Sequence, residues 1–286
     1  MMKRDFSGKR FRIALAATVV GASAVTAGVV RAASPLPSGA GDCSGLPSHE
    51  EVRQALTNAT RQPNGGLSNE MWATVENRDG FICVVAFTGE ARGDQWPGSR
   101  VISAQKANTA AAFSLPPGKG GLFPGLALAS GNIYWPVQPG GSLYGLQHSN
   151  PVDPAVGFGG NPVDYGTTND PMIGKRSGGV NVFGGGLALY SAAGIVGAIG
   201  VSGDTSCADH IVAWKARDGL TLDFVPNGLS GPGKDNLIYD IVPPGQNVGN
   251  VGAGQAQFSP SGFGHPQCDP VSTAVGNALP LTNPTS

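Results

Sequence analysis

The four histidines of this chain are its most obvious candidates for metal chemistry, and their spacing limits what they can do. They include no i, i+4 pair, and the sequence contains no C-x-x-C-H run. The spacing therefore indicates no multidentate metal site and excludes covalent attachment of a c-type haem. One imidazole beside an apolar slot can still supply a single axial ligand to a metal.

His148 is the better candidate for such a single ligand, because it lies in a loop that carries three aromatic residues, Tyr134, Trp135 and Tyr144. The alternative interpretation is an ordinary polar loop histidine. His210, directly after Asp209 in a predicted helix, is interpreted mainly as a surface residue and is the second candidate ligand.

Two cations, Arg100 and Lys106, lie at the start and on one face of a predicted helix over residues 99–114. Arginine and lysine are the side chains suited to meet the carboxylates of a planar acidic ligand. Lys106 stands among small residues on a stripe that faces the core, where an ammonium is costly unless it is paired or meets a ligand. A salt bridge, for instance to Asp209, is the alternative.

Several glycine runs invite a nucleotide-binding interpretation that their spacing does not support. The run 197–203 is not G-x-G-x-x-G and follows a hairpin, and the run 118–120 lacks the remaining residues of a P-loop. Ser202 is not flanked as a G-x-S-x-G nucleophile should be. Gly184, Gly185 and Gly186 would permit close backbone approach to a ligand, or a β-bulge. No catalytic acid, base or nucleophile is evident, so catalysis is left open.

The stretch 180–220 gives the clearest structural signals. Leu187–Tyr190 and Ile195–Ser202 are two apolar runs joined by small turn residues, which predicts a buried antiparallel hairpin. Ser206 followed by Asp209 resembles a capping box, and Gly219 is a stop signal, so a helix is expected over residues 207–218.

The remaining elements indicate an α+β fold. We expect helices after a capping box at Ser48 and Glu51 and over residues 99–114, and a hairpin around Asp79-Gly80. Two further strand-like runs, Leu220–Val225 and Asn236–Val242, lie in the tail. The predicted architecture is an antiparallel sheet of about five strands with packed helices and long Gly/Pro-rich loops. The loop 115–177 is long enough to indicate an ordered cover, a ligand-binding role or a subunit contact.

Two blocks of sequence resemble the GlcG/HbpS family, also called the haem-degrading or DUF336 family. The first is PGSRVISAQKANTAAAFS, which contains the K-A-x-T-A motif with Lys106 and Thr109; the second contains Gly184–Gly186, GAIGVSG and Asp209. The resemblance covers roughly residues 48–220, with 115–177 as a long insertion, and residues 221–286 form a loop-rich extension that matches nothing recognised.

The resemblance implies a profilin-like fold, a homo-oligomer and a small ligand, with haem as the ligand best associated with the family. Arg100, Lys106, Thr109, Gly185 and Gly186 are then the expected ligand-binding residues, with His148 or His210 as axial ligand. Binding is preferred to haem degradation. The alternatives are an enzyme or accessory subunit acting on a small organic acid or other metabolite, and a structural oligomeric subunit.

The N-terminus has the pattern of a signal peptide over residues 1–32, followed by a linker over 33–47. Five basic residues precede an apolar run from Ile13 to Val30, and small residues surround a cleavage site. Cleavage would leave 12 basic and 18 acidic residues, a balance that opposes nucleic-acid or anionic-membrane partners. A secreted or periplasmic protein without stable membrane insertion is expected.

Four cysteines in an exported chain predict two disulfides, and three connectivities are open. Their spacing is not that of a C-x-x-C zinc cluster. The preferred pairing is Cys83–Cys207, within the family-like region, and Cys43–Cys268, between the two loop-rich ends. Free buried thiols are the alternative.

Overall fold

The structure is a computed structural model that describes residues 42–243 and 258–282. The expected signal peptide and residues 33–41 of the expected linker lie outside these described residues. The longer helices are α1 (His49–Thr60), α2 (Ser99–Phe113), α5 (Ser206–Gly219) and α6 (Pro270–Asn277). The longer strands are β1 (Trp72–Asn77), β2 (Ile82–Phe87), β4 (Gly186–Ser191) and β5 (Gly194–Ser202).

These four strands form one antiparallel sheet in the order β2-β1-β5-β4. Each expected hairpin is present, and β1 joins the two hairpins by pairing with β5. The predicted α+β class is therefore confirmed. The fifth strand is reduced to a single parallel bridge, in which Asp223 pairs with Tyr190 at the β4 edge.

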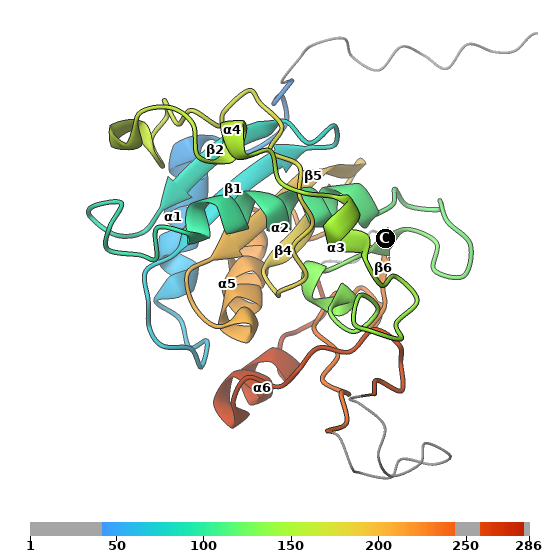
Figure 1. Ribbon diagram of the computed structural model, residues 1–286. Helices are drawn as coiled ribbons and strands as arrows, with labels where there is room; N and C mark the ends of the chain where they lie inside the picture. Colours follow the sequence, from blue (N-terminus) through green and yellow to red (C-terminus); the bar gives the residue numbers. More distant parts are fainter. Residues whose placement is uncertain (1–41, 244–257, 283–286) are drawn as a thin grey trace, which may run out of the picture. The chain divides into compact units, whose positions relative to one another are not determined.

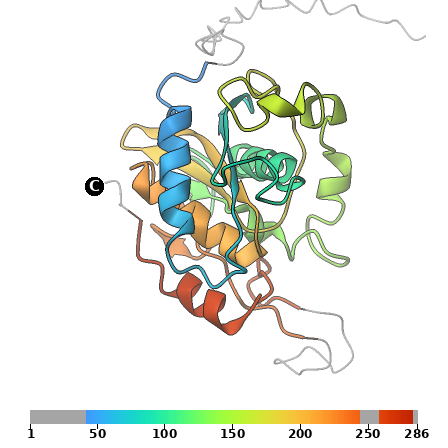
Figure 2. The same ribbon diagram turned by 90° about the vertical axis from the view of Figure 1, so that its left-hand side faces the viewer.

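Helices cover both faces of the sheet (Figures 1 and 2). Alternation along β1 explains the two layers, because successive side chains of a strand point to opposite faces. Ala73 and Val75 pack with apolar residues of α1 and α5, whereas Trp72 packs with Ala104 of α2. The capping box predicted at the start of α1 is confirmed, with Ser48 as N-cap and Glu51 returning the hydrogen bond.

Helix α2 lies directly on the sheet because two glycines admit its backbone. Gly186 and Gly200 are opposite each other in the β4–β5 pair. A Cβ on Gly186 would lie 2.3 Å from the carbonyl oxygen of Lys106, and one on Gly200 would lie 1.9 Å from that of Ser103. Any larger residue at either position would push α2 off the sheet, so the small-residue face predicted for this helix serves contact with the sheet.

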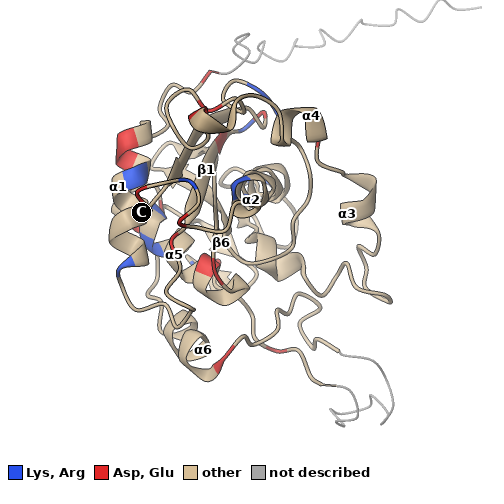
Figure 3. Ribbon diagram, turned by 60° about the vertical axis from the view of Figure 1, so that its left-hand side comes forward, with Lys and Arg blue, Asp and Glu red and all other residues tan. Residues whose placement is uncertain are grey.

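The long segment 115–177 is an ordered cover with short elements of its own. They are β3 (Leu126–Ala127), η1 (Ser130–Ile133), α3 (Leu146–Ser149), α4 (Pro154–Gly157) and η2 (Pro162–Asp164). Its second half adds Met172, Tyr165 and Ile173 to the apolar cluster around Trp72. Figure 3 shows acidic and basic residues side by side along α1, whereas α3 and α4 carry no charged residue.

The described part of the tail contains less strand than predicted. Of the two expected runs, 220–225 contributes the bridge at Asp223, and 236–242 contributes one bridge between Val242 and Phe258. The short strands β6 (Asn227–Gly228) and β7 (Gly231–Pro232) form a separate small sheet with β3. Buried polar side chains, instead of strand pairing, hold the tail against α5.

Two disulfides are present, as predicted, but the preferred pairing was wrong. The bonds are Cys43–Cys83 and Cys207–Cys268. Cys83 faces the layer of α1, which the segment carrying Cys43 enters, whereas Cys207 in the first turn of α5 meets the returning tail. Each bond therefore fastens one end of the described chain to the core, instead of joining the two ends.

Candidate functional site

A small cavity of about 280 Å³ opens between α2, the end of β5 and the start of α5. Its lining residues are Trp96, Ser99, Ile102, Lys106, Phe183, Ser202, Asp204, Ser206 and Asp209. Two larger hollows, of about 830 and 560 Å³, lie at the surface beside α1. Neither is lined by a buried charged side chain, so the small cavity is the better candidate for specific chemistry.

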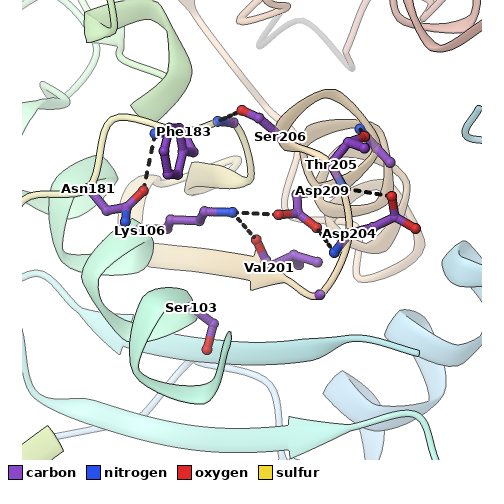
Figure 4. A network of polar contacts seen from close by, with 12 residues as sticks. Ser103, Lys106, Asn181, Phe183, Val201, Asp204, Thr205, Ser206 and Asp209 are labelled. Atoms are coloured by element: carbon purple, nitrogen blue, oxygen red, sulfur yellow. Dashed lines mark hydrogen bonds and ion pairs between the residues drawn. The ribbon is translucent and has the colours of Figure 1, made fainter. Parts of the chain in front are cut away.

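A buried ion pair forms one wall of this cavity. The Nζ atom of Lys106 lies 2.7 Å from Oδ2 of Asp209 and donates to the carbonyl oxygen of Val201 at 3.0 Å. Figure 4 shows the ammonium pointing from α2 towards Asp209 on α5. The salt bridge considered as the alternative for Lys106 is therefore present. Because an ammonium has three donors, these two contacts leave a third for a ligand.

Burial sets the electrostatics of the pair. Loss of hydration lowers the pKa of the Lys106 ammonium, and mutual attraction to Asp209 opposes this shift only in part. Burial likewise raises the pKa of the Asp209 carboxyl to about 6, against the lowering effect of Lys106. Desolvation thus outweighs attraction for both partners.

The loop between β5 and α5 holds Asp209 in place. Its Oδ1 accepts from the backbone N–H of Asp204 at 2.9 Å, and Asp204 in turn accepts from the backbone N–H of Leu67. The N-cap of α5 is Thr205, whose hydroxyl accepts from the N–H of Ala208. The capping box predicted at Ser206 and Asp209 was therefore wrong: the helix begins at Ser206, one residue earlier than such a box requires, and Asp209 is used for the ion pair.

Ser206 connects the cavity to the tail of the chain. Its Oγ accepts from the N–H of Gly184 at 2.7 Å and lies 2.7 Å from Nε2 of His265. His265 is buried, and burial lowers the pKa of its imidazole to about 4. Sequence inspection assigned Ser206 only a capping role and His265 none. The two residues lie 59 positions apart, and His265 stands in a loop-rich stretch with no pattern.

His210 is buried on α5, so its interpretation as a surface residue was wrong. Burial lowers the pKa of its imidazole to about 3, and neither ring nitrogen has a hydrogen-bond partner. The tail and the glycine run cover this position: a Cβ on Gly184 would lie 2.9 Å from that of His210 and 3.2 Å from Leu237.

Arg100 is not among the residues that line the cavity. Its guanidinium forms a buried bidentate pair with Asp170, donates to the carbonyl oxygen of Gly157, and stacks on the ring of Tyr165 at 3.7 Å. All three partners belong to the insertion, so Arg100 fastens this segment to α2.

Thr109 and the glycines predicted to bind ligand have contacts within the chain. Thr109 donates to the carbonyl oxygen of Gln105 and accepts from the N–H of Asn181. Gly185 has φ +113, and a Cβ there would lie 3.3 Å from Lys106 Nζ and 2.3 Å from the carbonyl oxygen of Val201. Gly186 lies against the backbone of α2 at Lys106. The register shift of β4 lies at Leu189/Tyr190, beyond the glycine run.

His148 is exposed on α3 and is not among the residues that line the cavity. Its loop is tied to the segment before β4, because the carbonyl oxygen of Asn150 accepts from the backbone N–H of Val180 at 3.1 Å. The exposed aromatics at the cavity are instead Trp96 and Phe183, which are 50% and 48% exposed. They offer a planar ligand two apolar surfaces.

Two further properties concern the described residues, 42–243 and 258–282. There, no group of three or more His, Cys, Asp or Glu side chains is placed to hold a metal ion. The helices of that part of the chain include none with the length and apolar character needed to cross a membrane.

Comparisons with known proteins give a family and two structural likenesses. The family model described as haem degrading protein HbpS-like matches residues 48–218. A crystal structure titled PduOC:Heme Complex is 19% identical, with a TM-score of 0.39, covering 59% of this chain and 89% of that one. The Klebsiella pneumoniae protein ORFY, assigned to DUF336, is 23% identical, with a TM-score of 0.40 and coverage of 61% and 90%. No curated protein matches the chain.

The family match spans every element that builds the cavity, from α1 to the last turn of α5. It contains both blocks of the resemblance, including Lys106 and Asp209. The chain therefore belongs to the HbpS-like family.

Proposed function

We propose that this chain is an exported small-ligand-binding protein whose ligand is haem. One observation supports this most directly: within a family described as haem degrading, a buried ammonium with an unused donor faces a cavity between two exposed aromatic side chains. Binding, with or without degradation of the ligand, is the function that such an arrangement supports best.

In this proposal the cavity receives one edge of the ligand. Its volume of about 280 Å³ lies just below the roughly 300–1,000 Å³ typical of small-molecule pockets. A propionate would enter and accept from Lys106, and the rest of the macrocycle would lie outside against Trp96 and Phe183. Arg100, held by Asp170, would act only by keeping the cover in place.

The axial ligand in this proposal is His148, which is exposed and whose loop is anchored near the segment leading to Phe183. His210 is the second candidate, because both of its ring nitrogens are unpartnered. Its imidazole would have to be uncovered first, since the tail and Gly184 enclose it.

The size of the cavity favours one alternative, a small organic acid in place of haem. A carboxylate of a few carbons would fit entirely beside Lys106 and would satisfy its third donor. An enzyme or accessory subunit for such a metabolite would not respond to hemin, which distinguishes the two proposals.

Export is part of the proposal. Two disulfides in a chain of this size are typical of oxidising compartments, and the basic and apolar pattern of residues 1–32 is that of a cleaved signal. Homo-oligomer formation stays a prediction from the family resemblance.

Titration of the purified protein with hemin tests the haem proposal. We expect a Soret band to develop, with its maximum shifted in His148→Ala because an axial ligand is lost. Lys106→Met should weaken affinity by about tenfold, or roughly 1–2 kcal/mol, with little spectral change. His49→Ala and the exposed Lys119→Met are the matched controls. Absence of any hemin-dependent band in the wild type would refute haem binding, and saturable binding of small carboxylates would then support the alternative.

A further inference from the structure

Ser206 and His265 have the geometry of a nucleophile and its base. Ser206 Oγ lies 2.7 Å from Nε2 of His265, and Nδ1 of the same ring lies 2.7 Å from the carbonyl oxygen of Pro266. A carbonyl oxygen can only accept, so Nδ1 carries the proton and Nε2 presents its lone pair. The serine hydroxyl therefore donates to Nε2, as it must for its proton to be removed.

The imidazole is held in this orientation and is neutral. The rings of Tyr134 and Tyr239 contact it edge-on, at centroid distances of 5.6 and 6.3 Å. Burial and the nearby Lys106 lower the pKa of His265, while the bond to Pro266 opposes this. A neutral imidazole of fixed tautomer is the form that accepts a proton.

Ser206 is positioned so that its oxygen can react. It is the first residue of α5, is only partly buried and lines the cavity. The N–H of Gly184 donates to the same oxygen at 2.7 Å, and the positive end of the α5 dipole lies at this turn. Both features stabilise negative charge that develops on the oxygen as the proton leaves.

We propose that Ser206 and His265 form an acyl-transfer site that hydrolyses small carboxylic esters bearing a negative charge. The ammonium of Lys106 lines the same cavity and is the group available to an anionic substrate. The cavity of about 280 Å³ limits the substrate to a few carbons. This activity goes beyond haem binding and does not depend on it, because His265 lies outside the family match.

The reaction needs only the ester and water. Ser206 Oγ bonds to the acyl carbon as its proton passes to Nε2, and the imidazolium then protonates the alkoxide as the ester C–O bond breaks. Water next attacks the acyl-serine and gives its proton to Nε2. Release of the acid returns that proton to Oγ, and nothing is oxidised or reduced.

Anchoring of the tail is the competing role for this hydrogen bond, but other contacts already provide it. Cys268 is bonded to Cys207, and Asp235 forms a bidentate, fully buried pair with Arg217. Anchoring of the tail therefore does not explain why the Nε2 atom of a histidine accepts from a serine hydroxyl that faces a cavity.

Labelling with diisopropyl fluorophosphate tests the proposal without any hemin. We expect one phosphoryl adduct on the folded wild-type protein at neutral pH, mapped to Ser206, with none on Ser206→Ala. His265→Gln should slow the labelling about 100-fold, the usual minimum effect of a general base.

The matched control is Ser130→Ala. Ser130 also accepts an N–H from the glycine run, that of Gly186 at 2.8 Å, but donates to the carbonyl oxygen of Phe183 instead of a histidine. It should label at the wild-type rate. A folded wild-type protein that takes up no adduct, or whose adduct maps to another residue, overturns the proposal. Because mapping is done on the wild type, this result holds even if Ser206→Ala does not fold.

Discussion

Two buried ion pairs leave the same helix six residues apart, and they serve different ends. Arg100 of α2 meets Asp170 in the insertion, with both side chains at most 2% exposed. Lys106 of α2 meets Asp209 of α5, also almost fully buried, but this pair borders a cavity. Burial alone therefore does not distinguish the two pairs; the cavity beside Lys106 and the chemistry of the cation do.

The choice of cation matches each position. An arginine fork binds a carboxylate with two parallel bonds, keeps its charge and stacks on an aromatic ring, which suits a permanent fastening. Asp170 also accepts from the backbone N–H groups of Gly166 and Met172, so its oxygens are fully used. A lysine is a point charge whose pKa shifts readily when buried, and two of the three donors of Lys106 are used by Asp209 and Val201.

The largest effect should come from breaking the arginine pair. Asp170→Asn leaves the buried Arg100 guanidinium without a counter-charge, which costs about 3–5 kcal/mol of unfolding free energy. Urea unfolding at pH 7 measures this loss. Glu50→Gln, at the exposed pair with Arg53, should leave the midpoint unchanged. A comparable midpoint for both variants would mean that Arg100 is not needed to hold the insertion.

A smaller effect should follow from the titration of Asp209. Its pKa of about 6 in the folded state lies above the ordinary value of 3.8, so the folded protein holds a proton that the unfolded chain releases. The resulting stability is full below pH 4 and is lost as pH rises through 6, by about 3 kcal/mol.

Comparison with Asp209→Asn isolates this titration, because the histidines titrate in both proteins. The unfolding free energy of the wild type should fall relative to that of the variant between pH 4 and pH 7. Parallel curves over this range would show that the Asp209 carboxyl is charged throughout.

The smallest effect on stability is expected when both members of the lysine pair are replaced. Buried ion pairs exchanged for apolar residues of similar volume often leave stability within about 1 kcal/mol or raise it. Lys106→Met with Asp209→Leu should therefore unfold near the wild-type midpoint while binding hemin as weakly as Lys106→Met alone. A large loss of stability in the double variant would assign this pair to the fold instead of the ligand.

The sequence predicted those parts of the fold that depend on neighbouring residues. The hairpin at Asp79-Gly80, the cap at Ser48 and the extent of α2 all follow from local rules of turn, cap and periodicity. The pair of Lys106 with Asp209 was also anticipated as an alternative, because a cation on a core-facing stripe needs a partner.

Contacts between distant segments could not be predicted in the same way. The position of His265 beside Ser206 and that of Asp170 beside Arg100 are set by how irregular segments return to the core, which no local pattern encodes. The disulfide pairing failed for this reason, and His210 was misplaced because a polar residue on a helix gives no sign that the tail will cover it.

The cover that the tail provides for α5 also bears on where the protein can be shortened. Ser206, His210 and Arg217 lie on one side of this helix, spaced four and seven residues apart. The tail residues that contact or enclose this side are Asp235, Leu237, His265 and Cys268. A chain cut at Asp218, where the family match ends, would leave the Arg217 guanidinium and the Cys207 thiol without their partners. The shortest independently folding unit therefore extends past the region shared with relatives, and expression boundaries are better placed after α6.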